Sequence, residues 1–204
     1  MPSDKFEQFQ IFLPAYLTDG SKYQLYHCLN SYPENLSDLN NNFYLPKNKF
    51  SNEYLQGDIC FGFHFLSLPD INLKTIEGLI ISNTCDISRD NKRSFSKIDA
   101  LYAPVQNIEK YRSHLLQHFP ENKIEAHLGA IRKQEITNIF YLPENPGLFP
   151  ESFVYLDKIF NCKISYLNPG NVQKQLSLGN YGFYILLFKL SIHFSRFGEG
   201  IDRR

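Results

Sequence analysis

The chain has 204 residues, of which 43% are hydrophobic, and its 21 basic side chains balance 21 acidic ones. This composition, with 18 Phe and 13 Tyr, is sufficient for a packed core and excludes a disordered chain. A formal net charge of zero excludes a nucleic-acid footprint spread over the whole surface, so any basic binding site must be local.

Residues 1–56 differ in composition from the rest of the chain. We interpret them as an N-terminal extension that packs on the main unit, residues 57–204, and not as a second domain. Within the extension, Tyr23, Tyr26 and Leu29 recur at helical spacing and are followed by a stretch rich in Asn and Ser. The extension is therefore expected to be partly helical.

From Gly57 onward the hydrophobic pattern changes to a period of two, which is typical of a β-strand. Ile59, Phe61, Phe63 and Phe65 are predicted to share one face of this strand. Further strands are predicted, in chain order, at 76–83, 98–105, 136–143, 152–160 and 163–167. Helices are predicted at 107–119, capped by Asn107, and at 176–194.

Six short strands with so few helices predict an antiparallel sheet, because a parallel sheet needs a crossover helix between most strands. We therefore expect a mainly β chain with helices, of the α+β class. Its strands are predicted to form a small, strongly curved antiparallel barrel with a C-terminal helix.

The segment 176–194 is long enough to cross a bilayer at ~1.5 Å per residue. Asn180, Lys189 and His193 interrupt it, however, so a buried or interface helix is favoured over a membrane span. Residues 181–188 are apolar nearly all round, so the helix needs a second covering surface besides the sheet.

Cysteine usage and the first residues bear on the compartment. No Cys-x-x-Cys pair occurs, which disfavours a zinc ribbon or a thioredoxin-like motif. The N-terminal stretch MPSDKFEQFQ is charged and polar, unlike a cleavable signal. We expect a cytoplasmic protein with reduced thiols and no bound cofactor.

The order of segments from Gly57 onward resembles the MazF/PemK toxin family. The matching segments are Gly57-Asp58-Ile59, Ile80-Ile81-Ser82-Asn83, Ala103-Pro104-Val105, SFVYLDKI at 152–159 and the leucine-rich segment 176–194. The resemblance covers roughly residues 57–195. It implies a compact SH3-like barrel with a C-terminal helix, a homodimer and metal-independent cleavage of RNA.

The chain departs from the family at the residues of the usual ribonuclease centre. Glu77-Gly78 stand where the family has Arg-Pro, and Val105-Gln106-Asn107 stand where it has a Thr. A carboxylate in place of the cation that meets the phosphate loses transition-state stabilisation. The usual catalytic centre is therefore not matched.

The stretch GLIISNTCDISRDNKR, residues 78–93, offers an alternative site. We predict Thr84, Asp86 and Arg89 as catalytic residues: Asp86 or Thr84 would activate the ribose 2′-hydroxyl, and Arg89 or Arg93 would hold the phosphate. Residues 88–97 contain four cations and one carboxylate, the clearest local basic patch in the chain. The residues predicted to contact RNA or a partner are Asn83, Cys85, Lys92, Arg93, Lys97, Arg132 and Lys133.

A purely structural interpretation of the same stretch stays open. Asn83 and Asp86 are typical turn residues, and Cys85 would be a small buried hydrophobe. Cys60, His64 and Cys85 could form a soft metal site, but no fourth ligand is visible, so no metal is predicted.

The sequence thus leads to a MazF/PemK-like protein of a bacterial toxin–antitoxin, stress or phage-defence module. It would engage RNA and, if it is an enzyme, act as an endoribonuclease. The alternative is a catalytically inactive protein-binding module, such as a regulator, an antitoxin-type partner or a scaffold, which the zero net charge and Glu77 favour. The expected partners are RNA or such a protein, together with a second copy of the chain. A membrane-tethered protein is a third, disfavoured hypothesis.

Overall fold

The structure is a computed structural model. It describes residues 18–20, 22–23, 43–49, 52–67, 69, 72–88, 90–91 and 98–195. Most of the predicted N-terminal extension, including its predicted helix beyond Tyr23, lies outside these residues. The described elements, in chain order, are η1 (Lys47–Lys49), β1 (Asp58–Ser67), β2 (Asn72–Ile80), α4 (Thr84–Ile87), β3 (Asp99–Asn107), α5 (Ile108–Leu115), α6 (Glu121–Arg132), β4 (Ile139–Leu142), β5 (Ser152–Tyr155), β6 (Phe160–Lys163), η2 (Ile164–Tyr166), β7 (Gln173–Ser177) and α7 (Asn180–Ser195).

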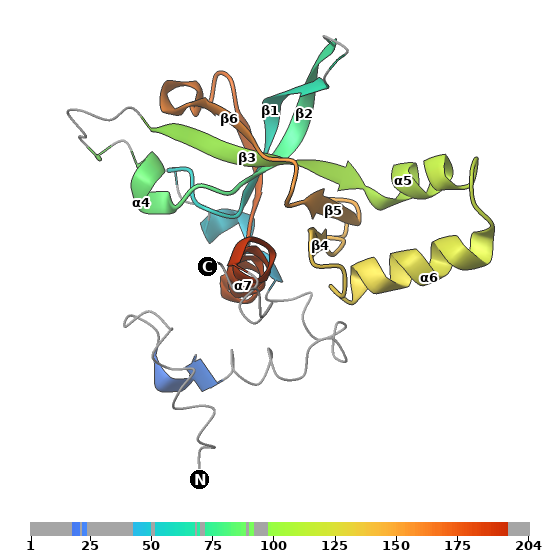
Figure 1. Ribbon diagram of the computed structural model, residues 1–204. Coiled ribbons are helices and arrows are strands. Elements are labelled where there is room, and N and C mark those ends of the chain that lie inside the picture. The colour runs from blue at the N-terminus through green and yellow to red at the C-terminus, as the bar shows by residue number, and fades with distance from the viewer. Residues whose placement is uncertain are drawn as a thin grey trace, which may run out of the picture.

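Seven antiparallel strands form a sheet in the order β4-β5-β3-β2-β1-β7, with β6 also paired to β3 (Figure 1). β3 organises this sheet. Its first residues pair with β6, its middle pairs with β2, and its last residues pair with β5. The predicted mixed α+β class with an antiparallel sheet is therefore confirmed.

The sheet does not close into a barrel within the described residues, because each end of the strand order is covered locally. At β4, the side-chain amide of Gln134 donates to Tyr141 O and accepts from Tyr141 N, both at 2.9 Å. At β7, Leu45 N donates to Ser177 O at 2.9 Å, and Tyr44 forms a bridge with Leu178. Neither edge is left to pair with the other.

Three hydrophobic clusters build the core. The first lies between the sheet and α7 and includes Ile59, Phe140 and Leu186. The second includes Cys60 and Phe63. Because successive strand residues point to opposite faces, β1 is buried on both sides. The third cluster packs α5 and α6 against β4 and β5.

The prediction of one apolar face along β1 is wrong, because the strand is irregular. Its register with β2 shifts between Phe61 and Phe63, so Phe61 is 44% exposed while Phe63 is fully buried. Gly62 occupies this bulge at φ 112°, and an added Cβ would lie 2.1 Å from the carbonyl oxygen of Asn171. Only glycine fits such a position.

Several predicted elements differ from the observed ones. The predicted strand at 163–167 is the 3-10 helix η2, and the predicted helix at 176–194 begins as strand β7, with α7 starting at Asn180. α6 was not predicted. α5 begins as expected, since Asn107 Oδ1 accepts from Lys110 N at 2.9 Å, but it ends at Leu115.

One side of α7 packs on the sheet, and aromatic side chains on its other side are exposed. Tyr181, Ile185 and Leu186 are buried, whereas Phe188 is 63% and Phe194 60% exposed. Among the described residues, no helix has both the length and the apolar character needed to span a membrane.

Candidate functional site

The predicted catalytic stretch forms α4, a single helical turn that follows β2. Asn83 caps it, since its Oδ1 accepts from Cys85 N at 2.9 Å. Thr84 Oγ1 accepts from Gln56 N at 3.0 Å, which ties α4 to the segment before β1. Ile87 is buried and fixes the turn on the core. The side chains of Asn83 and Thr84 thus hold the local structure, as the structural interpretation predicted for Asn83.

The other predicted residues of this stretch divide into two groups. Asp86 is half-buried, and Cys85 is exposed, so the interpretation of Cys85 as a buried hydrophobe is wrong. Arg89, Lys92, Arg93 and Lys97 lie outside the described residues. The combination of Asp86 or Thr84 with Arg89 or Arg93 therefore stays a prediction.

Arg132 and Lys133 do not join this stretch. They lie at the end of α6, whereas α4 lies beyond the opposite end of β3 (Figure 1). A strand of nine residues spans about 30 Å at ~3.3 Å per residue. Residues 83–86 and 132–133 therefore do not form one continuous patch.

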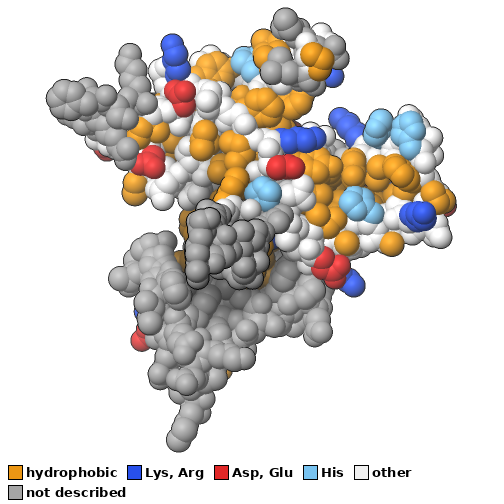
Figure 2. Space-filling model, in the orientation of Figure 1, with side chains coloured by type: hydrophobic (Ala, Val, Ile, Leu, Met, Phe, Trp, Pro, Cys, Tyr) orange, Lys and Arg blue, Asp and Glu red, His pale blue; other side chains and the backbone are white. Residues whose placement is uncertain are grey.

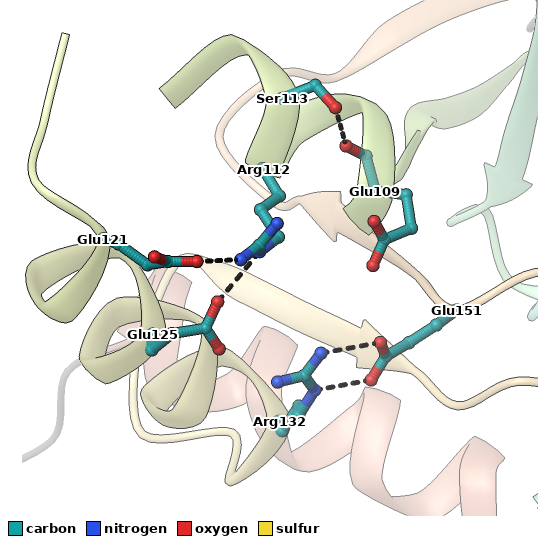
Figure 3. Close-up of polar contacts among 7 residues, drawn as sticks. All are labelled: Glu109, Arg112, Ser113, Glu121, Glu125, Arg132 and Glu151. Atoms are coloured by element: carbon teal, nitrogen blue, oxygen red, sulfur yellow. Dashed lines mark hydrogen bonds and ion pairs between the residues drawn. The ribbon is translucent and has the colours of Figure 1, made fainter. Parts of the chain in front are cut away.

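Arg132 is engaged by a carboxylate (Figure 3). Its Nε and second terminal nitrogen donate to the two carboxylate oxygens of Glu151 at 2.7 and 2.9 Å, and Tyr141 Oη donates to Glu151 at 2.6 Å. Partial burial alone would raise the pKa of Glu151, but the hydrogen bonds from Arg132 and Tyr141 lower it below its ordinary value. Binding a phosphate at Arg132 would require breaking this bidentate pair.

Arg112, on α5, is neutralised in the same way. It contacts Glu121 at 2.7 Å and Glu125 at 2.8 Å, both on α6 (Figure 3). Figure 2 shows cationic and acidic side chains interspersed with hydrophobic ones over the described part of this face, with no broad basic patch. The α5–α6 pair is therefore not a basic groove.

A cavity of about 290 Å³ lies at the opposite end of β3, and the sequence analysis did not predict it. It collects residues from β1, β3, β6, η2 and the turn before β7. They are His64, Tyr102, Asn161, Cys162, Lys163, Ser165, Tyr166 and Asn171. We call it the tyrosine–asparagine pocket.

Hydrogen bonds to β1 fix both tyrosines of the pocket. Tyr102 Oη donates to His64 O at 2.5 Å, and its ring stacks on Phe63 with centroids 4.1 Å apart. Tyr166 Oη donates to Gly62 O at 2.9 Å and lies 2.9 Å from His64 Nε2. Burial raises the pKa of Tyr102 to about 12, so its hydroxyl stays neutral at physiological pH.

Burial varies across the pocket, so that its floor and rim differ in chemistry. Tyr102 is 3% exposed and forms the floor, and Tyr166 is half-buried above it. Asn161, Lys163 and Asn171 are exposed at the rim. The rim thus offers two amides, each with a donor and an acceptor, and one cation.

The pocket lies near α4. Asp99, the first residue of β3, pairs with Lys163 of β6, and residues 92–97 precede β3 almost directly. Ile87 of α4 packs in the same core cluster as Tyr102 and Tyr166. α4 and the pocket therefore lie at the same end of β3.

The residues considered for a metal do not gather. Cys60 is fully buried and Cys85 is exposed, while the Nε2 of His64 faces Tyr166. Across the part of the chain that the structure describes, no three or more His, Cys, Asp or Glu side chains are placed to hold a metal ion.

Comparison with models of known protein families and with curated proteins gives no match for this chain. The function must therefore be inferred from the chemistry of the site.

Proposed function

We propose that the protein is a MazF/PemK-like member of a bacterial toxin–antitoxin, stress or phage-defence module, and that it binds single-stranded RNA in the tyrosine–asparagine pocket. The observation that carries the proposal is the pocket itself. It combines anchored aromatic rings, two amides and a lysine.

This combination suits an unpaired nucleotide. Unstacked RNA bases stack on aromatic side chains and form hydrogen bonds along their edges, while cations contact the phosphates. Tyr166 offers the ring, Asn161 and Asn171 offer the amides, and Lys163 offers the cation. A volume of about 290 Å³ lies at the low end of the range for ligand pockets, which suits one small group better than a large ligand.

The family assignment rests on the resemblance in sequence. The antiparallel sheet and the terminal helix packed on one of its faces are features that the resemblance also implies. The open sheet is a departure from that expectation. The homodimer and the compartment remain proposals that follow from the resemblance and the sequence.

Anisotropy of a fluorescently labelled single-stranded RNA tests the binding proposal. Lys163→Ala and Asn161→Ala change exposed rim residues, and each is expected to weaken binding roughly fivefold, since each removes about 1 kcal/mol of polar interaction. Lys123→Ala, an exposed lysine of α6, is the matched control and should leave binding unchanged. Equal losses in all three variants, or tighter binding of duplex RNA, would refute the proposal.

Cleavage is a separate question with its own test. The protein is incubated with long mixed-sequence RNA, with and without EDTA. Fragments that form in EDTA and disappear in Asp86→Asn would support metal-independent cleavage by the predicted residues. RNA that stays intact while binding persists would make the protein a binding module for RNA.

A second candidate function, the inactive protein-binding module, is favoured by the α5–α6 pair. Its arginines are neutralised by carboxylates, whereas Leu116 and Phe119, beyond the end of α5, are 44% and 54% exposed. If the protein binds no RNA but captures a protein partner, and Phe119→Glu abolishes that capture, this candidate is preferred.

A further inference from the structure

The hydrogen bonds already made inside the protein decide what the tyrosine–asparagine pocket can offer a ligand. Three of its residues, His64, Tyr102 and Tyr166, are tied to one another or to the backbone of β1. We call them the inner residues of the pocket. A tyrosine hydroxyl and a neutral imidazole can each donate one hydrogen bond and can also accept. The role left for a ligand therefore depends on where their protons go.

The protons of both tyrosine hydroxyls are used within the protein. Tyr102 Oη donates to His64 O at 2.5 Å, and burial raises the pKa of Tyr102 to about 12, so the proton is kept at neutral pH. Tyr166 Oη donates to Gly62 O at 2.9 Å. Because a backbone carbonyl can only accept, neither hydroxyl has a proton left for a ligand.

The bond between Tyr166 and Gly62 also fixes the tautomer of His64. Tyr166 Oη lies 2.9 Å from His64 Nε2. Since the hydroxyl proton goes to Gly62 O, a hydrogen bond at this contact needs the imidazole proton on Nε2. The neutral ring then has Nδ1 as a bare acceptor. This atom is buried and has no hydrogen-bond partner among the described residues.

The inner residues therefore present acceptors and no free donor. Nδ1 of His64 lacks a partner, and a buried polar atom in that state calls for an explanation. The rim amides of Asn161 and Asn171 do not select between donors and acceptors, because each carries both. Selection rests with the inner residues, and they favour a ligand group that donates an N–H.

We propose that the pocket selects a base with an exocyclic amine and rejects uracil, an inference that rests on the proposed binding of single-stranded RNA. Cytosine, adenine and guanine each carry an NH₂ group that can donate to Nδ1 of His64. Uracil has a single ring N–H between two carbonyl oxygens, which would face the inner acceptors. A site built for a hydrogen bond rejects an analogue that lacks it, because the buried group of the site stays unpaired. Only the nucleotide inside the pocket is selected in this way.

The experiment compares three labelled RNA octamers by anisotropy with the full chain. They are oligo(C), oligo(U) and an octamer of the 2-pyrimidinone ribonucleotide, which has the ring of cytosine with hydrogen in place of the amine. All three share one backbone, so contacts to the phosphates are matched. Oligo(C) should bind about tenfold more tightly than each of the others. Weak binding of the pyrimidinone octamer assigns the preference to the amine.

Two variants locate the preference within the pocket. His64→Phe keeps a flat ring and removes Nδ1, while Tyr166 retains its bond to Gly62 O. In this variant the affinities for oligo(C) and oligo(U) should agree within about twofold. Asn161→Ala is the matched control, because it changes a rim residue of the same pocket. It should weaken the binding of both octamers and leave the preference for oligo(C) unchanged.

Equal binding of oligo(C) and oligo(U) by the unmodified protein overturns the inference, as does a pyrimidinone octamer that binds as tightly as oligo(C). A preference that persists in His64→Phe overturns it as well. In each of these cases the proposed function stands, because RNA still binds. If no octamer binds at all, the proposed function fails and the selection of a base fails with it.

Discussion

At the scale of single residues, Lys189 is the clearest case of a side chain under constraint. It is 4% exposed, and its ammonium donates to Gln134 O at 3.0 Å and Ile136 O at 2.5 Å. Burial lowers its pKa to about 8. Lys189 therefore joins α7 to the turn after α6 through backbone carbonyls.

This constraint predicts that stability rises with pH. The folded-state pKa of about 8 lies below the unfolded value of ~10.4, so the unfolded chain binds more protons between them. The free energy of unfolding should increase by about 1.5 kcal/mol from pH 8 to pH 9.5, before tyrosines ionise. Urea denaturation across this range measures it, and Lys189→Met should flatten the increase. The same slope in both proteins would contradict the assignment.

Gly62 gives a second prediction, with a control in the same chain. Gly62→Ala should destabilise by about 3 kcal/mol or more, since its Cβ would meet the carbonyl oxygen of Asn171 at a positive φ. Gly129→Ala, on α6 with open space around it, should stabilise by up to about 1 kcal/mol. Urea denaturation measures the free energy of unfolding of the two variants. Equal changes in this free energy would contradict the bulge at Gly62.

At the scale of elements, β4 depends on a side chain that takes the place of a neighbouring strand. Gln134 is buried at φ 57° and satisfies both backbone groups of Tyr141. Unpaired strand edges template association with other chains. Gln134 therefore acts as a cover for this edge.

Gln134→Leu should remove that cover. Because the backbone groups of Tyr141 would lose their partners, the free energy of unfolding should fall by roughly 2–4 kcal/mol. Sedimentation velocity should then detect more concentration-dependent association than in the unmodified protein. A variant that sediments and unfolds like the original would show that the edge needs no cover.

The sequence predicted the elements whose signals are local. β1 carries a period-two pattern, β2 and β3 are short apolar runs, and the start of α5 carries an Asn cap. These elements appear close to the expected positions. α6 begins at Glu121, and its N-cap residue, Pro120, provides no side-chain cap, so the helix has no strong start signal. β7 merges with α7 in one apolar run, and the boundary at Gly179 depends on pairing with β1, which the local sequence does not encode.

The candidate site was only partly predictable for a related reason. The stretch around Asn83 stood out because its polar residues follow an apolar run. The tyrosine–asparagine pocket draws ordinary polar residues from segments as distant as His64 and Asn171, and only the bulge at Gly62 and the β3–β6 pairing bring them together. Arg132 seemed a phosphate ligand because its partner, Glu151, is 19 residues away.

At the scale of the whole molecule, several charges on the described residues are balanced as local pairs. The arginines of the α5–α6 unit pair with glutamates, and the buried Asp58 pairs with Lys174. Burial raises the pKa of Asp58, which Lys174 and the hydrogen bond from Ser177 partly offset. Under the proposed function, RNA would contact the described part of the chain at one end of β3, so binding should show a shallow salt dependence, equivalent to a few phosphates.

Crosslinking tests the central claim most directly. Single-stranded RNA carrying 4-thiouridine is irradiated with the full-length protein, and the crosslinked peptides are located by mass spectrometry. The account predicts crosslinks at Tyr166 and at neighbouring pocket residues within 161–171, reduced in Lys163→Ala. Crosslinks confined to α5 and α6, or none at all under conditions where the RNA binds, would contradict it.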